Sequence, residues 1–584
     1  MLTLEGLQGS ALYIRQAVKQ IYYHLQSVYK KEHQSSGSLV MAGLVFLQLS
    51  VILFLCVSFA GAHHCRVVPG DPSFPSAEKW NSLNTSISGR LVKAVHSAQF
   101  CNMHGGCTDA EWTSASFRAN IPGAMNQVNW EQDYESIPPS VCLRNSTDCG
   151  QGNVPLYAIL AEAVKDVQIG IAFSSTHNLR LAVKASGHDY LGRSTARNSL
   201  LISTHKFQNI TFAENFTVKG HNEGSAVTVG SGVPLNALYQ AAKEQGKILV
   251  GGTAATVVAA GGYIQGGGHS ALSPLLGLAA DNVLEFEVVT ANSTYLRVNE
   301  RENADLFWAL RGGVVSATFR TFLTFNATIS LVSMVANDTA AIGSIIATHA
   351  NHIFDWDDLY MGQYFYAYLN TTADAYMLSF ISYFPRISSD EASAALRPFL
   401  DDVEEFGQIV VQQFNETNIN DAVTAVDDGV GSNTVIGSRL IPASAYREHP
   451  DTFRHVYTQL FDAGTVAENT CTNIYLFLKS DITFFQIVLA NGWEDSPSLS
   501  NISSIQSAFK DFQLPILEQI AGSSGAAYSN EADSLEEHFN TTFFGLHYPR
   551  LENIKSRYDP KDLFIVAAGV GSDKWDKDGL CRVD

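Results

Sequence analysis

The segment that most constrains the fold of this chain is Lys184–Ser194, which reads KASGHDYLGRS. It directly follows the apolar run Leu179–Val183, which predicts a strand. Gly187 permits a tight turn with no bulky neighbour before His188. About seventy residues later, Gly261–Ser270 reads GGYIQGGGHS. Two such loops on opposite flanks of one α+β region can hold an elongated cofactor between them.

The residues around the histidine turn show the periodicity of a β-α-β unit. Residues 154–160 predict a strand, 163–173 a helix with apolar residues at helical spacing, and 179–183 a second strand. Further strands are predicted at 199–204, 209–212, 216–219, 226–229 and 283–290, and a helix at 234–245. In the second half, strands are predicted at 360–369 and 377–384 and a helix at 392–406.

The size and charge of the chain limit what it can bind. Its 584 residues, 46% of them hydrophobic and 16% charged, exceed one ordinary core and predict two or three folding units. Thirty-seven basic and fifty-seven acidic residues leave a formal charge of −20, which repels a phosphate backbone. We therefore expect a small-molecule ligand and no nucleic acid.

An apolar segment near the N-terminus predicts entry into the secretory pathway. No Asp, Glu, Lys or Arg lies between Glu32 and Arg66, and residues 39–62 are long enough to cross a hydrocarbon layer that needs about 20 residues. The segment is either a signal anchor with basic residues on its cytoplasmic side or a cleavable signal ending at Ala60-Gly61-Ala62. We expect cleavage and a secreted protein; the alternative is a single-pass anchor with the residues after 62 on the lumenal or extracellular side.

Sequons and cysteines agree with that compartment. Asn-x-Ser/Thr acceptors occur at Asn84, Asn145, Asn209, Asn215, Asn292, Asn326, Asn337, Asn370, Asn415, Asn501 and Asn540. Cys65, Cys101, Cys107, Cys142 and Cys149 crowd into a loop-rich stretch, where we expect disulfides of undetermined connectivity. A zinc site is the rival interpretation, but the spacings lack paired Cys-x-x-Cys units, and we predict no metal site.

The two loops and the C-terminal stretches 528–533 and 548–560 resemble the FAD-linked oxidases of the vanillyl-alcohol oxidase superfamily, with its PCMH-type FAD-binding domain. The similarity is greatest to the berberine-bridge-enzyme-like branch and its secreted fungal isoamyl-alcohol-oxidase-like group. It implies an α+β fold: a two-subdomain FAD-binding domain, an α+β substrate domain with an antiparallel sheet and helices, and a C-terminal segment that returns to the FAD domain. We divide the chain into a signal or anchor (1–62), a Cys-rich extension (63–150), the FAD-binding domain (151–330), the substrate domain (331–525) and the berberine-bridge-like segment (526–584).

The resemblance also implies a set of cofactor-binding residues. It makes His188 the point of covalent attachment of FAD, with Asp189 a candidate to orient the imidazole. Residues 252–262 contain no cysteine for a second attachment, so we expect a single covalent link. The other expected contacts are Lys184, Ser186, Gly187, Tyr190, Gly192, Ser194, Gly262, Gly266, Gly267, Gly268, Asp281, Asn282, Val289 and Tyr548.

For two residues, His269 and Tyr528, the sequence leaves two roles open. His269 either contacts flavin or substrate or only caps its loop. By resemblance to carbohydrate oxidases, Tyr528 is the candidate catalytic base; the alternative is a packing residue whose hydroxyl bonds to a backbone group. A phenol with an ordinary pKa of about 10 would need a nearby cation or a hydrogen-bonded carboxylate to act near neutral pH.

The resemblance implies a secreted FAD-dependent oxidase. It would move a hydride from an alcohol, sugar or secondary-metabolite substrate to flavin N5, with dioxygen as acceptor. Residues 314–323 and 474–496 depart from the family pattern, which leaves a catalytically silent FAD-binding protein as the alternative. A membrane-anchored interaction module is a third hypothesis. We expect a monomer that contacts a membrane only if the N-terminal segment is retained.

Overall fold

The computed structural model describes residues 65–583, except 311–315, 371–373, 424–428, 464–471, 478–482, 496–498 and 523–524. The predicted signal or anchor therefore lies outside the described residues, as do the beginning of the divergent stretch 314–323 and parts of 474–496. Within the described ranges, no helix combines the length and the apolar character needed to cross a membrane.

The first subdomain carries the histidine turn. Its sheet has the order β1-β2-β4-β3, and β2 and β3 both run parallel to β4. The predicted β-α-β unit is confirmed as β2, α7 and β3, because the helix buries Val167 and Ile171 against strands rich in apolar residues. The elements are β1 Leu91–Lys93, β2 Tyr157–Leu160, α7 Val164–Thr176, β3 Arg180–Lys184 and β4 Ser199–Ser203.

The second subdomain is a five-stranded antiparallel sheet of order β5-β6-β10-β8-β9. The two short strands predicted at 209–212 and 216–219 are one irregular strand, β5, which pairs with β6 across two register shifts. The divergent stretch keeps a strand: β10 pairs with both β6 and β8. The elements are β5 Ile210–Val218, β6 His221–Gly230, α8 Leu235–Glu244, β7 Lys247–Ile248, α9 Ser273–Leu276, β8 Val283–Val289, β9 Tyr295–Val298, α10 Ala304–Leu310, β10 Ser316–Arg320 and β11 Phe322–Leu323.

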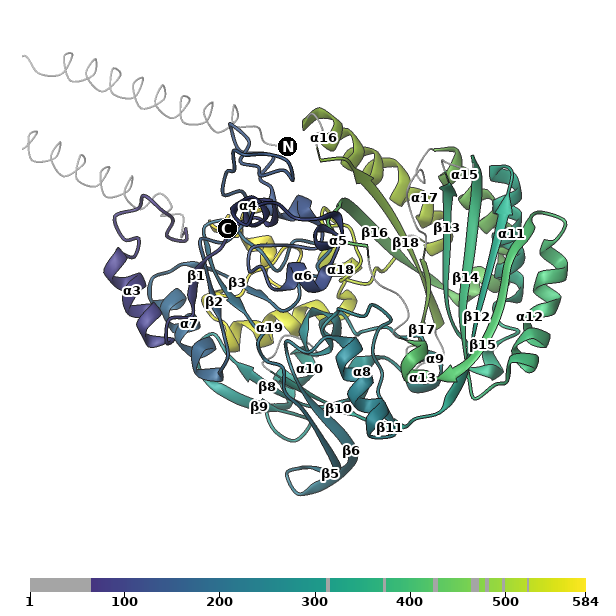
Figure 1. Cartoon of the computed structure of the whole chain (residues 1–584), viewed down its shortest axis with the longest axis horizontal. Coiled ribbons are helices and arrows are strands. Elements are labelled where there is room, and N and C mark those ends of the chain that lie inside the picture. The colour runs from purple at the N-terminus through teal and green to yellow at the C-terminus, as the bar shows by residue number, and fades with distance from the viewer. Residues whose placement is uncertain are drawn as a thin grey trace, which may run out of the picture. The chain divides into compact units, whose positions relative to one another are not determined.

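The substrate domain contains two antiparallel sheets, β13-β14-β12-β15 and β16-β18-β17. Helices α11, α12 and α15 lie over the larger sheet, and a single core joins their apolar faces to it (Figure 1). The strands are β12 Asn326–Ala336, β13 Gly362–Asn370, β14 Ala375–Pro385, β15 Gln408–Asn418, β16 Asn433–Pro442, β17 Thr472–Phe477 and β18 Thr483–Trp493. The helices are α11 Thr339–His352, α12 Ser389–Val403, α13 Ile419–Ala422, α14 Ala443–Glu448, α15 Pro450–Asp462, α16 Leu499–Ala508 and α17 Leu514–Ala521.

The Cys-rich extension and the C-terminal segment are joined covalently. Cys65 is bonded to Cys581, and local bridges Cys101–Cys107 and Cys142–Cys149 close two short loops. The extension contains α3 Ala77–Ser86, α4 Ser97–Met103, α5 Asp109–Trp112 and α6 Ala115–Ala119; the C-terminal segment contains α18 Phe539–Thr542 and α19 Tyr548–Tyr558.

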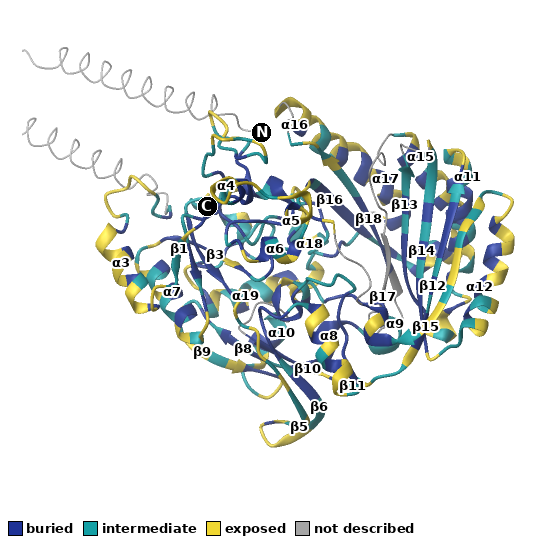
Figure 2. Cartoon of the chain, viewed as in Figure 1, coloured by how far each residue is buried: buried dark blue, intermediate teal, exposed yellow. Residues whose placement is uncertain are grey.

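Burial follows the layers of the fold. The strands at the centre of each sheet are buried, whereas the tip of the β5–β6 hairpin is exposed (Figure 2). The core of the second subdomain also takes in Tyr364, Tyr383 and Ile419 from the substrate domain. The FAD-binding and substrate domains therefore share apolar packing. The predicted α+β architecture is confirmed.

Candidate cofactor and active site

The histidine turn begins where β3 ends. Gly187 has φ +99°, a backbone conformation that favours glycine, so the chain reverses immediately before His188. The His188 Nε2 atom lies 2.6 Å from the Thr256 hydroxyl oxygen, in the alanine-rich stretch before the glycine loop. Desolvation lowers the pKa of His188 to about 4. The imidazole is therefore neutral throughout the physiological range.

Polar side chains of the turn accept hydrogen bonds from its own backbone. Asp189 accepts hydrogen bonds from the backbone N–H groups of Leu191, at 3.1 Å, and Ser194. The carboxylate of Asp189 therefore caps the next turn. That Asp189 also orients the imidazole remains a prediction. Ser186 accepts from the His188 backbone N–H at 3.4 Å.

Gly192 and Tyr190 lie on the same turn. A Cβ atom on Gly192 would come within 2.5 Å of the Trp130 ring, so this glycine allows the extension to pack closely against the turn. Tyr190 is half-buried.

The Cys-rich extension is hydrogen-bonded to the histidine turn. Lys184 is 1% exposed, and its ammonium donates to the carbonyl oxygens of Ile121 and Ala124 at 2.9 and 2.6 Å. Desolvation lowers the pKa of Lys184 to about 7. The Asn126 backbone N–H donates to the Gly187 carbonyl at 3.2 Å. The extension therefore positions both ends of the segment that leads into His188.

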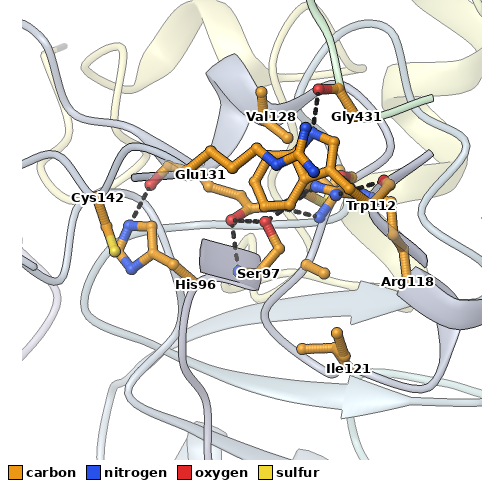
Figure 3. Close-up of polar contacts among 12 residues, drawn as sticks. His96, Ser97, Trp112, Arg118, Ile121, Val128, Glu131, Cys142 and Gly431 are labelled. Carbon is orange, nitrogen blue, oxygen red and sulfur yellow. Dashed lines mark hydrogen bonds and ion pairs between the residues drawn. The ribbon is translucent and has the colours of Figure 1, made fainter. Parts of the chain in front are cut away.

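A buried ion pair holds the extension in place (Figure 3). Glu131 accepts from the Arg118 guanidinium at 3.0 Å and from the Met125 backbone N–H at 2.8 Å. Its other oxygen accepts from the Ser97 backbone N–H and hydroxyl at 2.8 and 2.9 Å. The carboxylate is fully buried and is bonded on both oxygens, as a buried charge requires.

The C-terminal segment holds the turn through a second cation. The half-buried Arg193 guanidinium donates to the carbonyls of Ala567, Ser529 and Ala568 at 2.9, 3.0 and 3.3 Å. Burial lowers its pKa to about 10, so the guanidinium remains charged at neutral pH. The histidine turn thus contacts segments from both ends of the chain.

The glycine loop approaches the turn from the second subdomain. A Cβ on Gly261 would lie 3.2 Å from the Ala185 side chain, whereas a Cβ on Gly262 would meet nothing within 4 Å. Gly262 therefore leaves open space beside the histidine turn. Gly267 and Gly268 have φ +118° and +72°.

Other glycines of the loop are explained by protein packing. A Cβ on Gly266 would lie 2.5 Å from the Tyr528 ring, and one on Gly268 would lie 2.8 Å from the Tyr263 ring. At Gly266 and Gly268, two of the expected cofactor contacts, the absence of a side chain therefore makes room for protein side chains.

Asp281 and Asn282 form the turn that follows this loop. Asp281 accepts from the Leu278 backbone N–H, and Asn282 donates to the Leu276 and Leu278 carbonyls. Backbone bonds from residues 279 and 280 to Gly268 and Gly267 fix the turn against the loop. Val289, at the end of β8, packs on the core of the first subdomain.

The two tyrosines predicted at the site, Tyr528 and Tyr548, both have hydroxyl groups bonded to other parts of the protein. Tyr528 is 5% exposed, and its hydroxyl donates to the Tyr263 carbonyl at 3.3 Å and accepts from Asn530 at 3.0 Å. Burial, together with the charge of Glu531, raises the pKa of Tyr528. These contacts match the alternative role of Tyr528, a packing residue whose hydroxyl bonds to a backbone group.

Tyr548 is engaged within the C-terminal segment. Its hydroxyl donates to Asp573 at 2.8 Å and accepts from the Gly571 backbone N–H at 3.1 Å. These bonds tie the start of α19 to the turn at 571–573. The prediction that Tyr548 lines the flavin is not supported by any of these contacts.

His269 joins the glycine loop to a residue that sequence reasoning missed. Its Nε2 lies 3.0 Å from a carboxylate oxygen of Glu531, and its ring packs edge-on against Tyr528. The sequence placed Glu531 in the segment matched to the family, but nothing in its local pattern indicated the partner. Thr256 and the Arg118–Glu131 pair were missed for the same reason, because long-range contacts define them.

The residues at this junction fit an FAD molecule. The turn supplies a neutral imidazole, Gly262 leaves the backbone uncovered, and the buried side chains of Asn126 and Ser231 have polar atoms with no hydrogen-bond partner among the described residues. Ser231 lies next to Thr204, which bonds to the end of β3. Two surface cavities, of about 420 and 320 Å³, lie elsewhere, beside Trp112 and over the outer sheet at Thr228.

The fold and this junction define a flavin-dependent oxidoreductase, and comparisons with known proteins agree. A family model described as an FAD binding domain matches residues 155–299, and one described as berberine and berberine like matches residues 527–571. An uncharacterized FAD-linked oxidoreductase of Arthroderma benhamiae is 33% identical over 92% of this chain and 100% of its own length. The VAO-type flavoprotein oxidase VAO615 of Thermothelomyces thermophilus is 32% identical over 89% of this chain and 95% of its own.

A solved structure supports the same assignment. The crystal structure of the VAO-type flavoprotein MtVAO615 from Myceliophthora thermophila C1 superposes with a TM-score of 0.78 at 29% identity, covering 89% of this chain and 100% of that one. The chain belongs to the VAO-type FAD-linked oxidoreductases and carries the berberine-like C-terminal segment of that family.

Proposed function

We propose that the protein is a secreted oxidase that carries FAD on a single covalent link to His188. It oxidises an alcohol, a sugar or a secondary-metabolite intermediate, and dioxygen is the final acceptor. When bound, FAD supplies the acceptor for a hydride from the substrate carbon. The observation that carries the proposal is the neutral, partly exposed His188 imidazole at the meeting point of the two loops.

Attachment at His188 requires an unprotonated ring nitrogen. The lowered pKa of His188 provides it at any pH above about 4. His188 would hold the flavin through the lone pair of its unprotonated ring nitrogen, and the imidazole would release the hydrogen of its other nitrogen as a proton. The flavin methyl group would give up one hydrogen, and dioxygen would take up the two electrons and two protons as hydrogen peroxide. Thr256, on Nε2, restrains the rotation of the ring during that step.

Secretion is supported by the cysteines and the sequons. All six cysteines in the described part of the chain form disulfides, which persist in oxidising compartments. None of the eleven sequon asparagines is buried, so each is accessible to glycosylation. We therefore expect the secreted protein to lose apparent mass on treatment with an N-glycosidase.

The decisive experiment is the fate of the flavin after acid precipitation. We expect the flavin absorbance of the wild-type protein to remain in the pellet and that of His188→Ala to move to the supernatant. His221→Ala, an exposed histidine on the β5–β6 hairpin, is the matched control and should keep its flavin in the pellet. A yellow pellet from H188A would show that the link is elsewhere, and a colourless wild-type protein would refute the flavoenzyme itself.

A further inference from the structure

A polar cluster forms where three parts of the chain meet. His269 follows the glycine loop, Glu531 belongs to the C-terminal segment and Gln486 lies on β18 of the substrate domain. In Figure 1 the yellow C-terminal segment overlaps the FAD-binding domain, with α18 on the side toward β16 and β18. Backbone and side-chain bonds from the C-terminal segment to Leu440 and Arg439 of β16 place the two side by side.

The cluster centres on the Glu531 carboxylate. One oxygen lies 3.0 Å from His269 Nε2, and the other accepts from the Gln486 side-chain amide at 2.9 Å. The Glu531 side chain is 22% exposed, whereas His269 is 11% exposed and Gln486 is fully buried. The carboxylate is therefore the member of the cluster that an incoming molecule can reach.

The hydrogen bonds assign a proton to His269 Nε2. The Nδ1 atom is buried and has no hydrogen-bond partner among the described residues. A hydrogen on Nε2 satisfies the Glu531 carboxylate and leaves only an acceptor unpaired at Nδ1. Each carboxylate oxygen of Glu531 accepts one of these bonds, so lone pairs remain for a third partner.

Tyr528 lies beside the cluster but is unsuited to take a proton. Its hydroxyl already donates to a backbone carbonyl, and both burial and the Glu531 charge raise its pKa. In that position, a charged Glu531 keeps the phenol protonated. The charge available for proton transfer at this junction therefore lies on the carboxylate.

We propose that Glu531 is the proton acceptor of the oxidation and that His269 and Gln486 position it. This inference rests on the proposed oxidase function and names the base for it. In the step, the substrate O–H bond breaks and its proton goes to Glu531. The adjacent C–H bond breaks, its hydrogen leaves with both electrons to FAD, and the remaining electron pair of the O–H bond completes a C=O bond. The substrate is thus an alcohol or a sugar hydroxyl oxidised to a carbonyl.

Sulfite tests the position of Glu531 without a known substrate. Sulfite is an anion that adds reversibly to oxidised flavin at the hydride-accepting atom and bleaches its visible absorbance. A carboxylate close enough to take the substrate proton repels that anion, so Glu531→Gln should bind sulfite on the order of tenfold more tightly than wild type. Glu531→Asp keeps the charge and should stay near the wild-type value.

Matched controls separate this effect from general damage. Glu537→Gln removes a negative charge from the same segment, but Glu537 is exposed and pairs with Lys510, so its sulfite affinity should be unchanged. E531Q should retain the wild-type flavin content. If E531Q does not accumulate, Glu531→Ala removes the same charge and carries the same expectation.

A second measurement reports proton transfer itself. With any alcohol or sugar that bleaches the wild-type flavin under anaerobic conditions, E531Q should be reduced about 10²- to 10⁴-fold more slowly. Flavin-loaded E531Q with wild-type sulfite affinity would overturn the inference, whichever substrate is found. A wild-type protein without flavin would instead refute the proposed function, so the two failures are distinct.

Discussion

The Cys-rich extension and the C-terminal segment both hold the histidine turn, but their central carboxylates differ in environment. Glu131 in the extension is fully buried and accepts four hydrogen bonds, including one from Arg118. Glu531 in the C-terminal segment is partly exposed and is bonded to two side chains. A buried carboxylate whose oxygens are fully hydrogen-bonded, such as Glu131, serves as a structural anchor. A partly exposed carboxylate with lone pairs to spare, such as Glu531, can exchange a proton.

Their cations differ in the opposite direction, because here the extension contacts the group that titrates. The extension engages Lys184, whose pKa is lowered to about 7, so that this cation titrates near neutrality. The C-terminal segment engages Arg193, which stays charged with a pKa of about 10. We expect the contact between the extension and Lys184 to respond to pH. The contact between the C-terminal segment and Arg193 should not change below about pH 9.

The largest effect is expected from breaking the buried ion pair. Glu131→Leu leaves the Arg118 charge and the Ser97 and Met125 donors without their acceptor, so the free energy of unfolding should fall by about 3–5 kcal/mol. Urea denaturation followed by tryptophan fluorescence measures the loss. The double variant Arg118→Met/Glu131→Leu should recover part of it, because it no longer buries an unpaired charge. A loss below about 1 kcal/mol for E131L would show that the pair is not an anchor.

The disulfide that joins the two regions should come next. Cys65–Cys581 closes a loop of 516 residues, whereas Cys101–Cys107 closes one of six. A cross-link restricts the unfolded chain more when its loop is long, so Cys65→Ala/Cys581→Ala should lower the free energy of unfolding by about 2–5 kcal/mol. Cys101→Ala/Cys107→Ala is the matched control and should cost less. Equal losses would mean that local packing, and not loop length, sets the contribution.

Much of the fold could be predicted from the sequence. Periodic apolar residues placed β2, α7 and β3 within a few positions, because each buries a regular face. The extension was harder: residues 63–150 lack long periodic runs, so its helices and the pair Arg118–Glu131 had no local signal. A buried ion pair is defined by residues that meet only after folding.

The site was predicted unevenly for the same reason. His188 and the glycine loop follow from contiguous motifs, and the structure brings them together. The capping role of Asp189 was not predicted, because a carboxylate one residue from an imidazole can also reach backbone N–H groups further along its own turn. Glu531 lies three residues from Tyr528, but only the approach of His269 and Gln486 distinguishes the two as proton acceptors.

The smallest expected effect is a pH dependence that isolates Lys184. The unfolded chain keeps this lysine protonated up to about pH 10.4, whereas the folded protein releases the proton near pH 7. Between these values the unfolded state binds more protons, so the free energy of unfolding should rise with pH, by about 1 kcal/mol per unit from pH 7 to pH 9. Lys184→Met removes this contribution and also leaves the Ile121 and Ala124 carbonyls unpaired. We therefore expect K184M to be less stable than wild type at pH 7 and to fall further behind at pH 9. Urea denaturation at each pH measures the two stability profiles. Parallel profiles would show that Lys184 stays charged in the folded state. The extension would then hold the turn through a permanent cation, as the C-terminal segment does.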